Sequence, residues 1–424
     1  MDTDTPGEPP EPTVPDEPPE AEDHVTEDHV TEDPVAEEPP VVDDPVAEGG
    51  EPGEPDTAGS GGGGRARWWA LAGLVAMVAV AVVGWWGPWR DTSEPSQQSA
   101  ARSPTTTPGA TTSVVVPNGP VAPLTGVPVS QADAARLLRP ALVAKVDASA
   151  EAMPQIALGR ADVVLEVRVE GISRYLAAFQ SQDVHDIGPI RSARTTDPDL
   201  LAMFGHPLFA FSGGNQGVLR RVRASDWIQD VSEDAAPAAY HRGRDQPAPH
   251  NLIADAPTLW SMARDPVVVP TPLFAYRAAG SPAPGVPTAG IAVSVGSDAR
   301  FAWDEQRRGW LRWAFGTPHA DDSGTRIAPT NVVVLQTNYV ASPADNRSPE
   351  AVSVGFGRAW VLSGGRMVEG IWSRADRTQP WTLRDAAGAP MTLEPGTTWV
   401  ELADGPPLVL GRDAVAALPT SPAR

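Results

Sequence analysis

The stretch from Trp68 to Trp89 contains 22 residues and no charged side chain. A helix rises about 1.5 Å per residue, so about 20 apolar residues cross a hydrocarbon core of roughly 30 Å. Tryptophans at both ends suit the two headgroup layers, whereas a buried core helix or a cleaved signal peptide would not need them. We therefore expect a single transmembrane helix within residues 65–90, with everything else in the chain arranged on its two sides.

The flanking charges indicate the orientation of that helix. Arg65 and Arg67 precede it and Arg90 follows it, so the positive-inside rule favours an internal N-terminus by a small margin. We expect an integral, single-pass protein of the cell membrane, with its N-terminus in the cytoplasm and its C-terminal domains outside. The chain has no cysteine, which excludes disulfides and lipidated thiols.

Residues 1–64 carry nearly all of the net charge. They contain 21 Asp or Glu and no Lys or Arg, against a net charge of −22 for the whole chain, which leaves −1 for the rest. Many prolines and no aromatic residue predict a disordered acidic cytoplasmic tail, because such a composition buries too little apolar surface. The tail is either a solvating extension or a recruitment segment for a basic cytoplasmic partner. Residues 91–120, rich in Ser, Thr and Pro, are a linker, and we expect no nucleic-acid ligand.

Residues 121–265 have the pattern of an α/β-type domain. A helix-like segment at 131–138 precedes a short apolar strand at 141–146. In the run ADVVLEVRVEGISRYLAAFQS, hydrophobic and charged residues alternate up to Gly171, which predicts a hairpin. The charged side chains expected on its water-exposed face are Glu166, Arg168 and Glu170.

Three cations of this domain are candidate anion contacts. Lys145 is the only lysine beside 31 arginines, which suggests either a place that needs a compact ammonium or a pairing with Asp147 on the same strand face. Arg191 and Arg194 precede a helix that we expect to be capped by Asp197. Guanidiniums beside free backbone N–H groups suit a phosphate or a carboxylate, unless the aspartates that follow neutralise them.

A glycine-rich turn follows the apolar segment 207–212. Strand, glycines and helix together are the local pattern of an anion cradle, although a plain tight turn fits the same residues. No catalytic residue can be assigned, because the chain has no thiol nucleophile and no GxSxG or HExxH string. We expect no cofactor and no metal. The ligand-binding candidates for an anion are Lys145, Arg191, Arg194, Ser212, Gly213, Gly214, Asn215, His250 and Asn251.

A connector at 266–287 leads to a second domain at 288–412, which a short tail at 413–424 follows. Apolar and aromatic runs separated by glycine-containing turns predict a mainly antiparallel β domain. Its seven tryptophans fill the sheet core or, as an alternative, stack on sugar rings of a cell-wall glycan. The polar turn at 319–322 offers three metal ligands but lacks zinc-type spacing. The expected fold is therefore α+β: a single transmembrane helix, then an α/β-type domain and a mainly antiparallel β domain.

Several runs in the first domain occur together in a fixed order: KVDASAEAMPQIALGRADVVLEVRVEG, SRYLAAFQS, IGPIRSAR, SGG and APHNL. They resemble the N-terminal domain of the YerB-like lipoprotein family, a bacterial domain of unknown function, and residues 288–412 resemble that family's second domain. The resemblance implies anchoring outside the cytoplasmic membrane. Family members carry a lipidated cysteine, whereas this chain has none and offers the apolar helix instead. The resemblance implies no reaction, cofactor or catalytic residue.

These observations favour an extracytoplasmic binding module over an enzyme. We expect a membrane-anchored protein of the bacterial cell envelope that binds an anionic or glycan envelope component, such as a cell-wall or phosphorylated ligand. One alternative is a transferase or hydrolase of envelope polymers. Another is a scaffold that links a cytoplasmic partner, through the acidic tail, to an envelope assembly.

Overall fold

The computed structural model describes Met1, residues 119–344 and residues 347–421 of the 424-residue chain. The expected acidic tail, transmembrane segment and linker lie outside the described residues, apart from Met1 and the last two linker positions. All described residues from 119 onwards belong to one compact unit, which we call the body.

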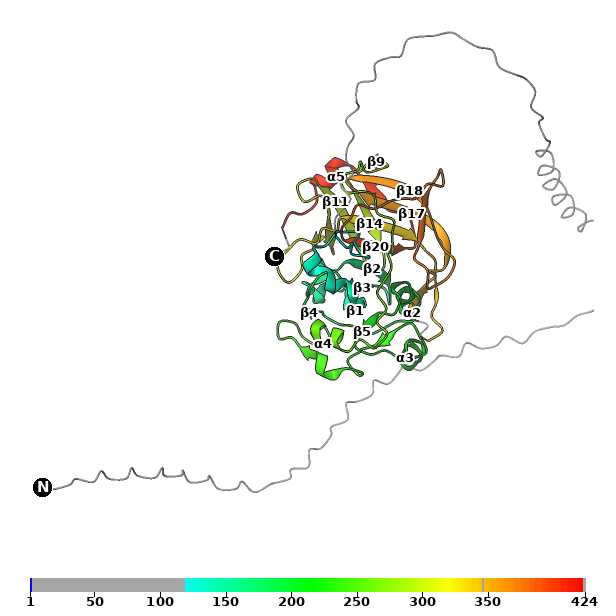
Figure 1. Ribbon diagram of the computed structural model, residues 1–424. Helices are drawn as coiled ribbons and strands as arrows, with labels where there is room; N and C mark the ends of the chain where they lie inside the picture. The colour runs from blue at the N-terminus through cyan, green and yellow to red at the C-terminus, as the bar shows by residue number, and fades with distance from the viewer. Residues whose placement is uncertain (2–118, 345–346, 422–424) are drawn as a thin grey trace, which may run out of the picture. The chain divides into compact units, whose positions relative to one another are not determined.

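The body is built on a sheet of eleven strands, and ten of them follow one another in hydrogen-bonded order. The eleventh, β9 (Val286–Pro287), pairs with β18. Figure 1 shows the order from β18 and β17 to β5. The ten strands are β19 (Thr382–Asp385), β18 (Arg366–Arg374), β17 (Gly355–Ser363), β14 (Asn331–Gln336), β20 (Thr398–Ala403), β2 (Val163–Arg168), β3 (Ser173–Phe179), β1 (Leu142–Asp147), β5 (Leu208–Ala210) and β6 (Gln229–Asp230).

Three smaller sheets and short helices complete the body. The five-stranded sheet has the order β13 (Thr317–Pro318), β12 (Gly309–Ala314), β11 (Asp298–Asp304), β10 (Gly290–Ser294) and β21 (Leu408–Leu410). The other two consist of β4 (Asp186–Ile187), β8 (Leu252–Asp255) and β7 (Tyr240–Arg242), and of β15 (Tyr339–Ala341) and β16 (Pro349–Ala351). The α-helices are α2 (Asp197–Leu201), α3 (Gln216–Arg223), α4 (Ala256–Ser261) and α5 (Arg412–Ala416). The 3-10 helices are η1 (Gln131–Leu138), η2 (Ala150–Ala152), η3 (Leu158–Arg160), η4 (Ala202–Phe204) and η5 (Pro237–Ala239).

The middle of the large sheet is buried on both faces. On one face a hydrophobic core joins its strands to the five-stranded sheet, which contributes Phe301 and Trp310. On the other face a second core includes Leu200 from α2 and Val222 from α3. A central strand covered on both sides has no face in water. Its polar side chains therefore need partners inside the protein.

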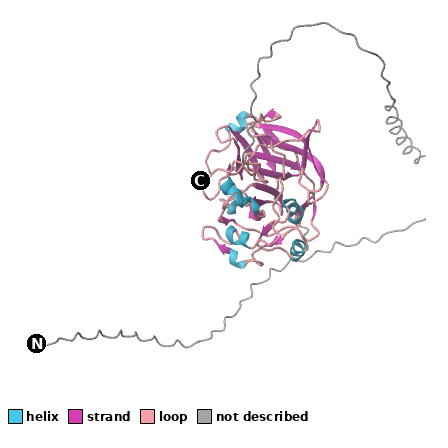
Figure 2. Ribbon diagram, in the orientation of Figure 1, coloured by secondary structure: helices cyan, strands magenta, loops and turns pink. Residues whose placement is uncertain are grey.

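The expected fold, α+β with a transmembrane helix ahead of an α/β-type and a β domain, is wrong for the described residues. These are mostly β, with 36% strand and 15% helix. Figure 2 shows strands through the middle of the body and only short helices. The longest, η1 and α3, have eight residues each, too few to cover a sheet as α/β helices do. No helix in this part of the chain is long and apolar enough to cross a membrane.

The hairpin predicted around Gly171 is confirmed. Strands β2 and β3 pair antiparallel with Leu165 opposite Leu176, and Gly171 has a φ of 74° in the turn. The expected water-exposed face is wrong for Glu166, which is 0% exposed. The period-two pattern was that of a half-buried strand, but the five-stranded sheet covers this face as well.

Strand β20, from late in the chain, lies between an early strand, β2, and another late strand, β14. Strand β20 pairs parallel with β2 on one side and with β14 on the other. Thr398 stands opposite Val163 and Asn331 in these two registers. The early and late halves of the body therefore share one hydrogen-bonded sheet.

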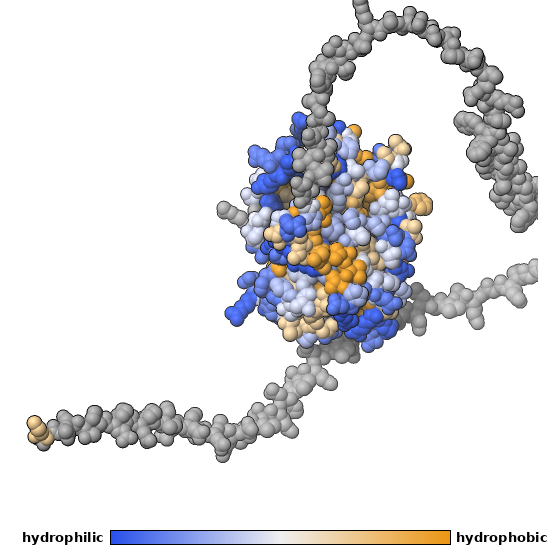
Figure 3. All heavy atoms as spheres, in the orientation of Figure 1, coloured by the Kyte–Doolittle hydropathy of each residue, from blue (hydrophilic) through white to orange (hydrophobic). Residues whose placement is uncertain are grey.

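The tryptophans of the second half are mostly core residues. Trp310, Trp399 and Trp372 are at most 2% exposed, whereas Trp303 is half-buried. Figure 3 shows one face of the body, which is hydrophilic over most of its area and has an apolar band across its middle. Among the described residues, the core reading of the tryptophans fits all but one of the seven.

Candidate functional site

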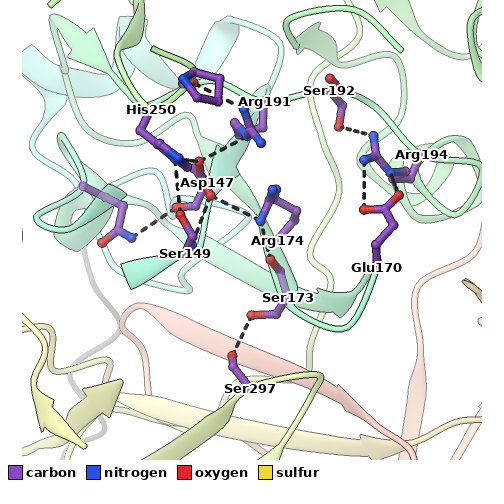
Figure 4. Close-up of polar contacts among 12 residues, drawn as sticks. Asp147, Ser149, Glu170, Ser173, Arg174, Arg191, Ser192, Arg194, His250 and Ser297 are labelled. Carbon is purple, nitrogen blue, oxygen red and sulfur yellow. Dashed lines mark hydrogen bonds and ion pairs between the residues drawn. The ribbon is translucent and has the colours of Figure 1, made fainter. Parts of the chain in front are cut away.

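Asp147 is the centre of a polar cluster at the end of β1. Its carboxylate is completely buried, with Oδ1 3.2 Å from Nη1 of Arg174. Its Oδ2 lies 3.1 Å from Nε of Arg191 and 2.7 Å from Nδ1 of His250. The backbone N–H of Ser149 donates to Oδ1 at 3.0 Å. Figure 4 shows these side chains converging on Asp147.

Backbone pairing at the end of β1 brings these residues together. The N–H of Asp147 donates to the carbonyl of Pro189, and the N–H of Arg191 donates to the carbonyl of Lys145, both at 2.8 Å. The loop that carries Arg191 therefore runs beside β1, and its guanidinium donates to the carbonyl of Pro249 at 3.3 Å. That contact places His250 next to the same carboxylate.

The cluster favours a charged Asp147. Burial alone would raise the pKa of this carboxyl, but Arg174, the Ser149 N–H and Arg191 hold it below its usual value. Arg174 itself is 5% exposed, and burial lowers the pKa of its guanidinium. Two guanidiniums thus share one carboxylate in a site that excludes most water.

Lys145 lies behind this cluster, with its Nζ atom 2.6 Å from Oδ1 of Asp197 and both side chains at 0% exposure. Burial lowers the pKa of Lys145, and the adjacent Asp197 opposes that effect. The second oxygen of Asp197 accepts a hydrogen bond from the backbone N–H of Arg194 at 2.7 Å. The expected partner of Lys145, Asp147, is taken by the guanidiniums instead.

Arg194 makes a two-pronged ion pair with Glu170, through Nε at 2.6 Å and Nη2 at 3.0 Å. Burial would raise the pKa of Glu170, but the hydrogen bond and charge of Arg194 lower it to about 2. The structure therefore brings Arg191 and Arg194 into one loop but gives them different partners.

The ion pairs of the cluster leave one positive charge without a carboxylate of its own. Lys145 is paired with Asp197 and Arg194 with Glu170, while Arg174 and Arg191 share Asp147. Lys145 and the three arginines thus make four cations against three carboxylates, without counting His250. The surplus positive charge lies at the shared carboxylate, where the side chains of Arg191 and His250 are 22% and 19% exposed.

The glycine-rich turn lies beside the same loop, because Ser212 N–H donates to the Arg191 carbonyl and Ala193 N–H donates to the Gly213 carbonyl. Gly213 has a φ of 113° and open space where a side chain would be. The helix start that follows is covered, since the Asn215 side chain caps α3 and donates to the Ala344 carbonyl at 3.3 Å. The remaining turn residue, Gly214, packs against Val218.

His250 contacts the cluster through one of its two ring nitrogens. Nδ1 faces Asp147 and, at 3.3 Å, Ser149 Oγ, while Nε2 makes no hydrogen bond to another described residue. The next residue, Asn251, donates to the Gly243 carbonyl and lines a cavity of about 270 Å³ that Pro189, Asp245 and Asp322 also line. Its volume lies just below the range of roughly 300–1,000 Å³ that is usual for ligand sites.

The polar turn at 319–322 does not gather as a metal site. His319 is completely buried between Arg312 and Gln155, and Asp322 accepts from the backbone N–H of Ala157. Within the described residues the ligand-type cluster is a different one, His185 with Asp186 and Asp255 on the surface.

Arg174, Asp147 and Gln155 were not among the sequence candidates for ligand contacts. Arg174 lies in the predicted return strand of the hairpin, and Asp147 lies two residues after the sole lysine, so the positions themselves were visible. The sequence carries no signal that folds the loop at Arg191 onto both of them.

The chain is similar to known proteins over most of the body. Residues 124–267 match the N-terminal domain and residues 290–400 the C-terminal domain of the protein family of unknown function DUF3048. The protein named "Putative lipoprotein YerB" of Bacillus subtilis (strain 168) is 26% identical over 295 residues, which covers 66% of this chain and 85% of that protein. The crystal structure of B. subtilis YerB aligns with a TM-score of 0.59 at 21% identity, over 67% of this chain and 97% of that chain.

Proposed function

We propose that this chain, which belongs to the DUF3048 family of proteins of unknown function, is an envelope-associated binding protein that holds an anionic group of an envelope component between Arg191 and His250. The observation that carries the proposal is the surplus cation at Asp147. A guanidinium with an unpaired share of charge in a mostly buried site binds a phosphate or carboxylate more strongly than one in open water.

The surroundings favour a phosphorylated or carboxylated sugar unit. Carboxylates of Asp245 and Asp322 line the neighbouring cavity, where they would repel a second anion and accept hydrogen bonds from hydroxyl groups. An anionic head at Arg191 with a hydroxyl-bearing ring in the cavity uses both features. Asn251 lines this cavity, and Ser212 and Gly213 lie beside the loop that carries Arg191. Lys145 and Arg194 support that loop through their ion pairs.

Location outside the cytoplasm is part of the proposal and rests on the lipoprotein relative. The cytoplasmic N-terminus and the recruitment role of the acidic tail concern residues that the structure does not describe, and they stay predictions.

Titration of the full-length chain with inorganic phosphate and with a sugar phosphate, followed by calorimetry, tests the binding. Arg191→Ala should lower the affinity for either ligand about 10- to 100-fold, because a charge-assisted hydrogen bond is worth roughly 1.5–3 kcal/mol. Arg384→Ala, on β19 at the other end of the sheet, is the matched control and should leave the affinity unchanged. Equal affinities for Arg191→Ala and wild type, or no retention of the chain on cell-wall fractions, would reject the proposal.

A second candidate, hydrolysis or transfer at an envelope polymer, is favoured by one observation. The Asp147 carboxylate orients Nδ1 of His250, which leaves Nε2 without a hydrogen bond to another described residue, as a general base requires. Release of nitrophenol from bis(p-nitrophenyl) phosphate by wild type, and its loss in His250→Gln, would support this activity. Binding without turnover would leave the binding protein as the function.

A further inference from the structure

A closed ring of buried hydrogen bonds and ion pairs connects the site to the second half of the body. From the backbone carbonyl of Asp147, the ring passes through Gln155, His319 and Arg312 to Glu166. It returns through Ser173 and Arg174 to the carboxylate of Asp147. All seven residues are at most 5% exposed.

The donors and acceptors in this ring have one consistent direction. Arg312 can only donate, so His319 Nδ1 accepts from it at 2.7 Å. The proton of the neutral ring is then on Nε2, which donates to Gln155 Oε1 at 2.7 Å. The Gln155 amide is thereby oriented to donate to the Asp147 carbonyl at 3.1 Å. Burial and the neighbouring Arg312 also hold the pKa of His319 well below its usual value.

The other arm of the ring leads from Arg312 to the carboxylate of Asp147. Arg312 Nη2 lies 2.7 Å from Glu166 Oε2, and Ser173 Oγ donates to Glu166 Oε1 at 2.6 Å. The Ser173 carbonyl in turn accepts from Arg174 Nη1 at 3.0 Å, the same nitrogen that faces Asp147 Oδ1. Both arms therefore end on Asp147, one at its backbone and one at its side chain.

Two members of the ring come from the part of the chain that matches the family's C-terminal domain, and five come from the N-terminal part. Direct ion pairs and hydrogen bonds keep the ring in a fixed geometry. If one of them breaks, a buried donor or acceptor is left without a partner, which costs free energy. We infer that Gln155, His319 and Arg312 are positioning residues that fix Asp147 and His250, so that the binding site is complete only with both halves of the body. The effect on phosphate binding rests on the proposed function, whereas the effect on the position of Asp147 and His250 does not.

Substitutions of His319 test the ring one bond at a time. His319→Gln keeps a donor near the position of Nε2 and should preserve the contact with Gln155. His319→Asn keeps only an acceptor near the position of Nδ1 and should release Gln155 and Asp147. His241→Asn, at an exposed histidine, is the matched control. Gln155→Met removes the amide group but keeps a side chain of similar volume. It serves as the test variant if the His319→Asn chain does not fold.

The readouts are the ring ¹⁵N shifts of His250 in the full chain at pH 8.5, assigned with His250→Gln, and the dissociation constant for inorganic phosphate. In wild type the His250 proton should be on Nδ1, facing Asp147. In His319→Asn and Gln155→Met it should move to Nε2, with phosphate bound about tenfold more weakly, as for other outer partners of a site. His319→Gln and His241→Asn should retain the wild-type values.

Each outcome decides one of the two proposals. Folded His319→Asn and Gln155→Met chains with the wild-type tautomer and wild-type phosphate affinity would overturn the positioning role. A tautomer change in these variants, with no phosphate binding even by wild type, would support the positioning role and reject the proposed ligand. A loss of both signals in His319→Gln as well as in His319→Asn would show a general disturbance of the core, and it would overturn the bond-by-bond role of the ring.

Discussion

Lys145 and Asp197 form an ion pair that is completely buried, with Nζ and Oδ1 2.6 Å apart. Removing the lysine leaves the carboxylate in the core without its cation, which typically costs about 3–5 kcal/mol. We expect Lys145→Met to lower the free energy of unfolding in urea by that amount. The exposed Arg412→Met is the control and should change it by less than about 0.5 kcal/mol.

A loss below about 1 kcal/mol for Lys145→Met would contradict the role of this pair.

The sequence made Lys145 conspicuous as the only lysine, but the partner it suggested, Asp147, is two residues away on the same strand. The actual partner is distant in sequence, and only the packing of α2 on the sheet brings it near.

Glu401 is buried beside Glu166, opposite it in the parallel pairing of β2 and β20, and neither of its carboxyl oxygens has a hydrogen-bond partner in the described structure. Burial and the adjacent Glu166 raise the pKa of Glu401 well above its usual value. The folded state therefore binds more protons than the unfolded state between the ordinary pKa, about 4.3, and the raised one. Stability should fall as the pH rises through this window.

Replacing the Glu401 carboxyl by an amide tests the direction of this pH dependence. We expect Glu401→Gln to match wild type near pH 4 and to become relatively more stable at higher pH, by about 1.4 kcal/mol per pH unit inside the window. Urea unfolding from pH 4 to pH 8 measures this difference. The exposed Glu151→Gln is the control, and an advantage of Glu401→Gln that is independent of pH would contradict the buried acid.

At the scale of elements, Gly370 in β18 is a position where only glycine fits. A Cβ atom there would lie 2.0 Å from the Arg384 carbonyl oxygen and 2.7 Å from the Met391 sulfur. Strand β19 would have to move away, so we expect Gly370→Ala to cost about 1–3 kcal/mol in urea unfolding. Gly405→Ala, with nothing near its Cβ position, should be close to neutral, and equal effects of the two changes would argue against this packing.

Short-range patterns predicted individual hairpins well. One of the glycine-containing turns expected in the second half joins β17 to β18, where Gly364 and Gly365 have φ values of 59° and 73°, as a two-residue hairpin turn requires. Turn chemistry is local, so sequence shows it. Burial of Glu166 depends on a sheet packed from elsewhere in the chain, and alternation alone assigned that face to water.

At the scale of the whole molecule, β20 makes the halves of the body depend on each other. An isolated chain of residues 119–267 would leave an edge of β2 unpaired and Glu166 without Arg312. We expect this fragment to lack cooperative thermal unfolding by circular dichroism. Adding residues 286–421 from a separate chain should restore the transition, whereas a fragment that unfolds cooperatively alone would contradict the shared sheet.

The division into two domains by composition gave no hint of this sharing. Parallel pairing between distant segments leaves no mark in a single sequence, since buried parallel strands are simply short apolar runs. The candidate site follows the same rule. Arg191 and Arg194 could be named in advance, but Arg174, the Asp147 carboxylate and the buried ring of hydrogen bonds are brought to them by tertiary structure.

The anion position is the most direct test of the binding proposal. Crystals of the chain soaked in tungstate, a phosphate analogue with strong anomalous scattering, would locate the site without assuming a natural ligand. We expect an anomalous peak within hydrogen-bond distance of the Arg191 guanidinium and His250 Nε2, absent in Arg191→Ala crystals. A wild-type map with no peak there, or the same peak in the variant, would contradict it.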